Sequence, residues 1–289
     1  MERAQHGSRD IAKAVGGTHF VIRPLATRAD YDACTALQEI TWGAGFNERV
    51  PPGVLRLSQR LGGIASGAFD PDGSLLGFVF GMTGLYDSRV SHWSDMLAVR
   101  PDARDRGIGE ALKWHQRERL LEVGVTLAQW TFDPLEARNA WLNFARLGCT
   151  SSEYVRNFYD ASDSPLHLGL ATDRLIVSWD LDSDRVARRH RNGVPPSSEA
   201  MRSAPLVNAS RLVRGHLDIG SVHTDPDASV LRVAIPTDIQ KLKREAPELA
   251  LEWQQSVREA FEFYFARGYT ATELLRGDVE RSYVIQRSG

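Results

Sequence analysis

Runs of apolar residues separated by polar breaks predict strands and helices in alternation along most of this chain. Residues 19–26 form a short β-rich run, and apolar positions between Tyr31 and Ile40 then recur at helical spacing. A second short helix is expected over 54–63, where two glycines end the pattern. The sequence Asp-Pro-Asp-Gly at 70–73 lies between two apolar runs and predicts a β-hairpin.

The middle of the chain continues this alternation. Because strands joined through a helix pair in parallel, the pattern predicts an α/β (α+β) fold, a mixed central sheet flanked by helices. Strands are expected over 91–101, 126–134, 150–160 and 174–182, with helices over 107–124 and 135–148.

Changes in composition predict how the chain divides. Residues 1–17 are polar and bounded by glycine, which favours a mobile tail before a first domain at 18–182. Residues 183–215 are basic, rich in Pro and Ser and aperiodic, which is typical of a linker. The remaining segment, 216–289, contains the most periodic helix of the chain, over 247–267, and predicts a smaller α/β segment.

Two segments of the sequence resemble each other. FARLGCTSSEYVR at 144–156 and FARGYTATELLR at 265–276 each run from a helix end through a glycine into a strand. Two explanations stay open. Either both segments use a common way of ending a helix, or the C-terminal segment is a partial duplication of the second half of the first domain, without its ligand loop.

Composition narrows the classes of protein. A chain of 289 residues with 42% hydrophobic and 25% charged residues can bury a core without disulfides or metals. Lys+Arg and Asp+Glu nearly cancel, so no global basic field points to nucleic acid or to a membrane surface. The two cysteines and the histidines lack metal-ligand spacing, and no signal-like or membrane-spanning apolar run occurs. We therefore expect a cytoplasmic protein without a metal.

The segment 99–112 is the part of the sequence that most clearly indicates chemistry. It runs from a strand through a loop with two arginines into a helix whose first turn contains Gly107 and Gly109. Glycines let an anion approach the backbone, and the N–H groups of a helix N-terminus bind phosphate oxygens. The segment therefore predicts a pyrophosphate site. Leu112 stands where a dinucleotide fingerprint needs Gly or Ala, and no Gly-Lys-Ser/Thr follows, so neither a dinucleotide fold nor a P-loop fits.

The spacing Arg104-x-x-Gly107-x-Gly109 resembles the coenzyme A pyrophosphate loop of the GCN5-related N-acetyltransferase (GNAT) superfamily. The order of elements over 19–181 and the pattern from Asn139 to Leu147-Gly148 are similar to that superfamily as well. The sequence around 130–148 looks like a poorly characterised bacterial branch with an extra C-terminal segment. The resemblance implies a GNAT domain followed by a segment like half of such a domain.

The resemblance also implies a cosubstrate, acetyl-CoA or another acyl-CoA. Its pyrophosphate would lie on the loop, its pantetheine arm would lie beside the preceding strand, and a backbone N–H near Leu97 would stabilise the oxyanion. The residues implied to bind it are Leu97, Ala98, Val99, Arg104, Asp105, Arg106, Gly107, Ile108, Gly109, Glu110 and Asn139.

Direct acyl transfer needs a base for the acceptor amine and an acid for the leaving thiolate. Asp95 and His92 are the candidate bases, and a solvated carboxylate or a turn histidine is the alternative for each. The position of the usual tyrosine acid in the superfamily is Phe144, which cannot donate a proton. Tyr154 and Tyr159 are possible substitutes, with packing as the alternative, and the thiolate can also leave without an acid.

We therefore predict an enzyme, a GNAT-type N-acyltransferase that acts on a small amine or an amino-acid-like acceptor. Two alternatives stay open: a non-catalytic module that binds acyl-CoA in a regulatory role, and an acyltransferase that uses a carrier protein or an oxygen acceptor. No nucleic acid or membrane partner is expected, and a homodimer is left open. The residues expected near the acceptor are Trp42, Phe46, Asn47, Glu48 and Arg49, with an ordinary exposed loop as the alternative.

Overall fold

The computed structural model describes residues 11–15, 18–159, 170–213, 216–219, 221–277 and 281–287. The chain forms two compact units, one up to Ala128 and one from Gln129 onward. This division falls within a strand of the first expected domain, whereas the composition of the chain changes near residue 183. The domain boundaries drawn from composition stay a prediction.

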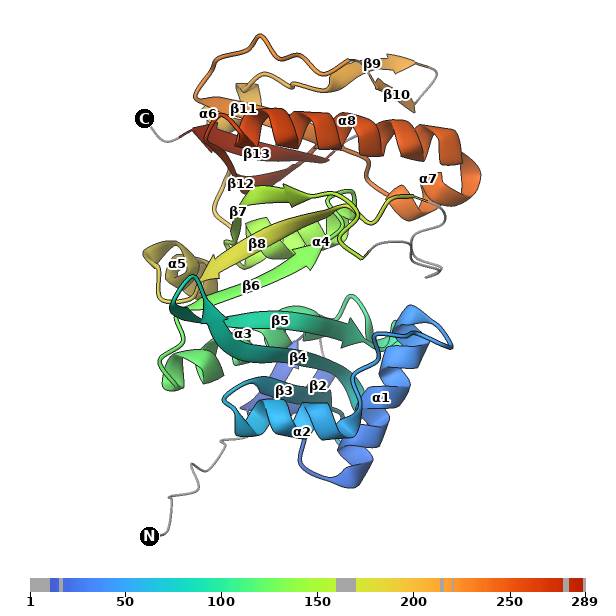
Figure 1. The fold of residues 1–289 in the computed structure, drawn as a ribbon, viewed down its shortest axis with the longest axis vertical. Helices are drawn as coiled ribbons and strands as arrows, with labels where there is room; N and C mark the ends of the chain where they lie inside the picture. The colour runs from blue at the N-terminus through green and yellow to red at the C-terminus, as the bar shows by residue number, and fades with distance from the viewer. Residues whose placement is uncertain are drawn as a thin grey trace. The chain divides into compact units, whose positions relative to one another are not determined.

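Unit 1 is an antiparallel sheet with helices packed on both faces (Figure 1). The strands lie in the order β1-β2-β3-β4-β5. They are β1 (Ile11–Val15), β2 (Thr18–Pro24), β3 (Ile64–Phe69), β4 (Leu75–Tyr86) and β5 (Arg89–Val99). The helices are α1 (Arg28–Trp42), α2 (Pro52–Arg60) and α3 (Ile108–Glu122), with a 3₁₀ turn η1 (Pro101–Ala103) before α3.

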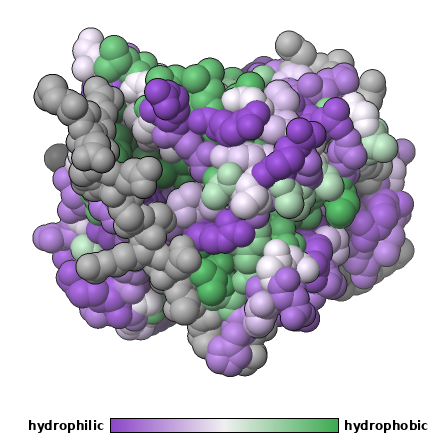
Figure 2. All heavy atoms as spheres, turned by 90° about the horizontal axis from the view of Figure 1, so that it is seen from below, coloured by the Kyte–Doolittle hydropathy of each residue, from purple (hydrophilic) through white to green (hydrophobic). Residues whose placement is uncertain are grey.

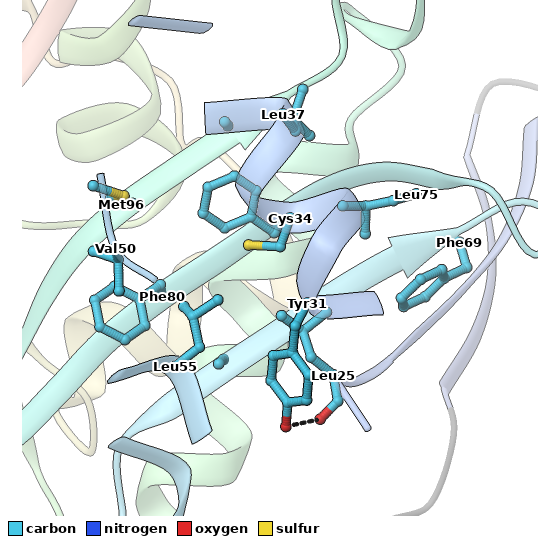
Figure 3. Close-up of a cluster of buried hydrophobic side chains, with 13 residues drawn as sticks. Leu25, Tyr31, Cys34, Leu37, Val50, Leu55, Phe69, Leu75, Phe80 and Met96 are labelled. Atoms are coloured by element: carbon cyan, nitrogen blue, oxygen red, sulfur yellow. Dashed lines mark hydrogen bonds between the residues drawn. The ribbon is translucent and has the colours of Figure 1, made fainter. Parts of the chain in front are cut away.

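One face of this sheet carries the core that α1 and α2 cover (Figure 3). Tyr31 of α1 donates a hydrogen bond from its hydroxyl to the Leu25 carbonyl oxygen at 2.9 Å. Thr27 and Asp30 form a capping box that begins α1, as expected where a polar residue precedes a periodic apolar run. The remaining side chains of the cluster include Cys34, Leu37, Val50, Leu55, Phe69, Leu75, Phe78, Phe80, Met96 and Ala98.

Part of the N-terminal segment that was expected to be a mobile tail forms strand β1. Residues 11–15 pair with β2 in antiparallel register, with Ile11 opposite Ile22. Five alternating residues are too few to predict a strand, but pairing with β2 satisfies their backbone groups. Residues 1–10, the rest of the expected tail, lie outside the described residues.

The predicted hairpin between β3 and β4 is confirmed. The N–H of Gly73 donates to the Asp70 carbonyl oxygen at 3.0 Å, and Gly73 has a φ of 82°. The expected parallel pairing across helices is wrong for β2 and β3, which pair antiparallel. A single connecting helix would return the chain to the end of the sheet where β2 begins, so that the next strand would run parallel to β2. Two helices, α1 and α2, connect β2 to β3, so the chain re-enters the sheet at the end where β2 finishes and β3 runs antiparallel.

Unit 2 is also a sheet with helices, and its strands lie in the order β6-β8-β7-β12-β13-β11 (Figure 1). Its strands are β6 (Leu127–Phe132), β7 (Thr150–Val155), β8 (Arg174–Asp180), β11 (Val230–Ile235), β12 (Tyr269–Arg276) and β13 (Arg281–Arg287), with a separate pair β9 (Ala209–Val213) and β10 (His216–Ile219). Its helices are α4 (Ala137–Ala140), the π-helix η2 (Trp141–Arg146), α5 (Asp184–Asn192), α6 (Glu199–Ser203), α7 (Ile239–Glu245) and α8 (Pro247–Phe265).

The strand order of unit 2 is the same when read from either end. β6, a helical segment, β7 and β8 form a first repeat, and β11, a helical segment, β12 and β13 form a second. The two meet where Ser151 of β7 pairs with Ala271 of β12. The similar sequence segments occupy matching places, since Gly148 and Gly268, with φ of 77° and 80°, both end a helix before these strands. This arrangement favours partial duplication over a shared way of ending a helix.

The expected linker contains a helix that packs on the second repeat. Ser183 caps α5, accepting a hydrogen bond from the Val186 N–H, and Arg185 and Arg189 both donate to the carboxylate of Glu273 in β12. Arg189 is only 5% exposed. Residues 184–192 are therefore an ordered part of unit 2, although their basic composition resembles that of a linker.

The fold class predicted from the sequence, α/β with a central sheet flanked by helices, is confirmed by these two sheets.

Candidate functional site

The N-terminus of α3 has backbone donors that no side chain of the described residues caps, as expected for an anion site. Gly107 precedes the helix in the left-handed conformation, with φ of 72° and ψ of 3°, and no described side chain caps it. The first backbone hydrogen bond of the helix runs from the Ala111 N–H to the Gly107 carbonyl oxygen at 3.0 Å. The N–H groups of Ile108 and Gly109 precede that bond, so they and the positive end of the helix dipole are available to an anionic ligand.

The loop before α3 adds positive charge. Arg104 and Arg106 are exposed, and neither forms an ion pair within the described part of the chain. Arg104 donates from Nε to the Val99 carbonyl oxygen at 3.2 Å. Asp105 between them has a φ of 63°, so two residues of this short loop, Asp105 and Gly107, adopt the left-handed conformation. Such a turn gathers backbone N–H groups as anion sites require.

The end of β5 lies directly against this helix. A Cβ atom built on Gly109 would be 3.7 Å from Val99 Cγ2 and 3.8 Å from Leu97 Cδ2. The Arg100 N–H donates to the Leu76 carbonyl oxygen at 2.8 Å. Since backbone groups alternate in direction along an antiparallel strand, those of Leu97 and Val99 point away from β4. A ligand on the α3 N-terminus thus has strand main chain beside it.

A β-bulge interrupts β5 just before these residues. Met96 pairs with Phe80 and Trp93 pairs with Met82, so Ser94 and Asp95 together oppose Gly81. A bulge bends its strand and redirects the side chains next to it, and bulges are frequent beside active sites. The interruption falls at one of the two predicted bases.

His92 lies inside unit 1. It is 0% exposed, and its two ring nitrogens lie 3.0 Å from Thr83 Oγ1 and 3.0 Å from Gln116 Nε2. Burial, and to a lesser degree the charge of Lys113, lowers the pKa of His92 to about 3. Its role as the base stays a prediction, and its surroundings favour a neutral structural imidazole.

Asp95 is exposed on β5. Although the residue is exposed by area, surrounding protein atoms shield its carboxyl from part of the solvent, and this desolvation raises its pKa; the negative charge of Glu48 raises it further. Glu48 belongs to the loop expected to line the acceptor pocket, so the structure places two predicted residues within electrostatic range of each other. In the same loop, Phe46 stacks on Trp42 with ring centroids 5.4 Å apart, and Arg49 forms an ion pair with Glu39.

Asn139 lies in unit 2 and is exposed on α4, directly before the π-helix η2. In this helix the Leu147 N–H donates to the Leu142 carbonyl oxygen, which is five residues earlier. π-helices are rare and often occur at functional sites. A role for Asn139 in binding coenzyme A stays a prediction from the sequence resemblance.

Tyr154 lies in unit 2, where its hydroxyl donates to the Asp173 carboxylate at 2.7 Å. Arg258 of α8 donates to the same oxygen at 2.7 Å. Burial, and then the bond to Asp173, raises the pKa of Tyr154. A phenol that already donates to a buried carboxylate is a poor proton source, so its acid role stays a prediction. Tyr159 approaches Thr131 Oγ1 at 3.1 Å through its own hydroxyl.

Phe144 occupies the place expected for a tyrosine acid and is fully buried. Its ring packs edge-on against Tyr283 of the second repeat, with centroids 5.3 Å apart. The Tyr283 hydroxyl donates to the Pro134 carbonyl oxygen at 2.7 Å. The Phe144 ring has no hydroxyl, and the Tyr283 hydroxyl is already hydrogen-bonded. Both rings pack in the core of unit 2.

Sequence reasoning missed the polar side chains beneath β5. Lys113 and Gln116 of α3 are buried and bind Ser94 and His92. Their spacing in the sequence could have indicated them. Lys113 and Gln116 are three residues apart and adjacent to the apolar Leu112, so they lie on the side of the helix that faces the sheet.

A hollow on unit 2 contains none of the predicted site residues; it is lined by Arg156, Gln255, Arg258, Glu259, Glu262 and Phe263. Within the described ranges, no group of three His, Cys, Asp or Glu residues could hold a metal ion.

The surface of unit 1 carries several large apolar side chains, among them Leu57, Leu61 and Leu85. On the face drawn in Figure 2, hydrophobic residues lie between hydrophilic ones.

Among the described helices, none has the length and hydropathy needed to cross a bilayer. The expected cytoplasmic location and the question of a homodimer stay open.

Comparison with known proteins gives similarity in structure only. No family model matches the chain, and neither does any curated protein. The ribosomal-protein-S18-alanine N-acetyltransferase from Escherichia coli is similar at 18% identity with a TM-score of 0.42, over 57% of this chain and 95% of that one. Naa50 from Arabidopsis thaliana, in complex with the bisubstrate analogue CoA-Ac-MVNAL, is similar at 13% identity with a TM-score of 0.42, over 55% and 97%. The NatC complex bound to Gag peptide and CoA is similar at 15% identity with a TM-score of 0.41, over 56% and 98%.

Proposed function

We propose that this chain is a GNAT-type enzyme, an acyl-CoA-dependent N-acyltransferase, with acetyl-CoA or a related thioester as the acyl donor. The uncapped N-terminus of α3 carries the proposal, because Gly107 in the left-handed conformation leaves backbone donors for a pyrophosphate. Arg104 and Arg106 supply the charge that a pyrophosphate needs. The adjacent strand end supports the same reading, because it offers the main chain of Leu97 and Val99 to the pantetheine arm.

Binding requires a small rearrangement. Arg104 holds the Val99 carbonyl oxygen, which is one of the groups that the pantetheine amide would use. The arginine exchanges this contact for the pyrophosphate, to which it can form charge-assisted hydrogen bonds. Arg104 therefore acts on both parts of the coenzyme site.

The reaction that fits is direct transfer. The nitrogen of a neutral amine attacks the thioester carbonyl carbon, the new C–N bond forms, and the C–S bond breaks with its electron pair on sulfur. The amine arrives as a cation and gives one proton to Asp95, directly or through water, before the attack. The proton that its nitrogen loses after the attack goes to the leaving thiolate. A backbone N–H near Leu97 donates to the oxyanion.

The acceptor is a small amine or amino-acid-like molecule. Burial, and then the negative charge of Glu48, raises the pKa of Asp95. The two neighbouring carboxylates, when ionised, attract a cationic amine. The raised pKa also makes Asp95 a better proton acceptor than an ordinary surface carboxylate.

A second candidate is a module that binds acyl-CoA without transferring the acyl group. The buried His92, the engaged Tyr154 hydroxyl and the packed Phe144 favour it, because none of the three is poised to move a proton.

Release of coenzyme A separates the two candidates. We expect a thiol reagent to detect amine-dependent release from acetyl-CoA, and we expect Asp95→Asn to abolish most of it. Asp32→Asn is the matched control, since Asp32 is an exposed carboxylate paired with Arg28 on α1. Binding without release across a panel of amines would support the binding module and contradict the enzyme.

A further inference from the structure

A chain of buried hydrogen bonds joins α3 to β5 and β4 in unit 1. Lys113 Nζ donates to Ser94 Oγ at 2.8 Å and to Gln116 Oε1 at 3.0 Å. Ser94 Oγ donates to the same Gln116 oxygen at 3.0 Å. Gln116 Nε2 lies 3.0 Å from His92 Nε2, and His92 Nδ1 lies 3.0 Å from Thr83 Oγ1. We call these five residues the β5 network.

The direction of every proton in the β5 network follows from its ends. The Lys113 ammonium can only donate, so Gln116 presents its oxygen to Lys113 and its NH₂ group to His92. The Thr83 hydroxyl donates its one proton to the Gly62 carbonyl oxygen at 2.9 Å, so it accepts from His92. His92 must then carry its proton on Nδ1 and accept at Nε2. The chain is complete only while the imidazole is neutral.

The network converges on Ser94, the first residue of the β5 bulge. Ser94 accepts from Lys113 and donates to Gln116, so its hydroxyl is fixed on both sides. A bulge leaves residues without regular ladder partners, so side-chain contacts decide its geometry. Two side chains of α3, Lys113 and Gln116, therefore contact the bulge through Ser94.

The bulge in turn places the residues that the reaction needs. Asp95 is its second residue, and Leu97 follows two positions later. A buried ammonium is costly, and an apolar residue would often serve packing as well. Lys113 is only 2% exposed. A buried ammonium at this position is consistent with a role in fixing the geometry of β5.

We propose that Lys113 and Gln116 are positioning residues, which hold the β5 bulge so that Asp95 and the Leu97 main chain meet the acceptor amine and the thioester. His92 belongs to this support as a neutral imidazole. The inference rests on the proposed function, since it assigns residues to the same reaction.

The test compares variants that remove a buried amide inside and outside the network. Gln116→Leu removes every contact of the amide, Gln116→Glu keeps an oxygen for Lys113 and Ser94, and Ser94→Ala removes only the hydroxyl at the bulge. Asn208→Leu is the matched control in unit 2. Asn208 is a fully buried amide bonded to the N–H and the carbonyl oxygen of Ala234 at 2.7 and 3.0 Å.

Four quantities are measured for each protein: kcat with a small amine, the Kd for acetyl-CoA by titration calorimetry, Tm, and hydrogen exchange at the amides of 92–97. We expect Gln116→Leu and Ser94→Ala to lower kcat by about 10- to 100-fold. Their Kd should change far less than their kcat, since the α3 N-terminus that would hold the pyrophosphate is untouched and only the Leu97 contact to the pantetheine arm moves. Exchange at 92–97 should accelerate. Gln116→Glu should retain most of the kcat, and Asn208→Leu should lower Tm without changing kcat.

An unchanged kcat in Ser94→Ala would overturn the positioning role while leaving the proposed function intact. Equal losses of kcat in Gln116→Leu and Asn208→Leu would also overturn it, because general destabilisation would then explain both. If Gln116→Leu fails to fold, Ser94→Ala decides. A wild type that binds acetyl-CoA but never releases coenzyme A would overturn the transfer function, and the positioning role with it.

Discussion

Gln116 Nε2 and His92 Nε2 lie 3.0 Å apart in the interior of unit 1. Because Gln116 must donate, His92 can only accept there, and a proton on His92 Nε2 would break the contact. This requirement agrees with the burial and the nearby Lys113 charge that lower the pKa of His92 to about 3. One contact between two nitrogens thus links a proton position to the stability of the unit.

The stability of the protein should depend on pH through His92. The unfolded histidine titrates near 6.5 and the folded one near 3, so the unfolded state binds more protons between these values. The free energy of unfolding should therefore fall as pH drops from 7 to 4.5, by at most about 1.4 kcal/mol per pH unit from this group. Urea unfolding across this range should show a shallower slope for His92→Asn, and equal slopes would contradict the assignment.

Measurements above pH 4.5 avoid a second pH-dependent contribution to the free energy of unfolding, which comes from Asp30. Asp30 has its pKa lowered, first by the hydrogen bond from Arg23, so its contribution is present above about 3.8 and lost below it.

Gly81 should tolerate no side chain. A Cβ atom on Gly81 would lie 2.3 Å from His92 Nε2 and 2.4 Å from the Trp93 carbonyl oxygen. We expect Gly81→Ala to lower the free energy of unfolding by about 1–3 kcal/mol. Gly84→Ala on the same strand is the control, because nothing lies within 4 Å of the added carbon. Urea unfolding of both variants is the measurement, and similar stabilities would show that the close approach of His92 to Gly81 is absent.

Arg258 should matter more to stability than Arg156, although both pair with a carboxylate in unit 2. Arg258 binds Asp173, which is 2% exposed, whereas Arg156 binds Glu262 at the surface. Removing one partner of a buried pair costs about 3–5 kcal/mol, against about 1 or less at the surface. Thermal unfolding of Arg258→Met and Arg156→Met compares them, and equal losses would contradict the buried pairing.

The pH dependence of transfer should report the Asp95 carboxyl. The rate kcat/KM should rise with pH as Asp95 loses its proton, at a midpoint above that of an ordinary aspartate, since burial and then Glu48 raise its pKa. Glu48→Gln should move the midpoint to lower pH, but only slightly, because burial is the larger cause. Asp32→Asn is the control, because it also removes one negative charge but at a site away from Asp95. A midpoint that stays in place, or moves to higher pH, would exclude Glu48 as a neighbour of the base.

Local patterns predicted most elements of the fold. The apolar spacing of α8, the Asp-Pro-Asp-Gly turn and the helix start at Gly107 each depend on neighbouring residues only, and these three elements are confirmed. Strand β1 was missed because its stability comes from pairing with β2 rather than from its five residues. Helix α5 was missed because its basic composition outweighed the signals of Ser183 at its start and Gly193 at its end.

The candidate site could be predicted only where it is continuous in sequence. The loop 104–109 is one continuous segment, so its glycines and arginines indicate a candidate site directly. The β5 network combines residues from β4, β5 and α3, so no local pattern contains it. The π-helix η2 and the bulge at Ser94 and Asp95 depend on hydrogen-bond register, which a pattern of apolar positions does not encode.

The central claim is that the N-terminus of α3 binds the pyrophosphate of an acyl-CoA, and titration calorimetry with acetyl-CoA tests it most directly. Gly107→Asp places a carboxylate at this site, where it competes for the N–H groups and repels the ligand. Gly124→Asp is the control, with the same charge at the other end of α3, a φ of 78° and nothing within 4 Å of the added carbon. We expect the wild type and Gly124→Asp to bind alike and Gly107→Asp to bind at least about tenfold more weakly. No wild-type binding at roughly 1 mM ligand, or equal binding by Gly107→Asp, would contradict the claim.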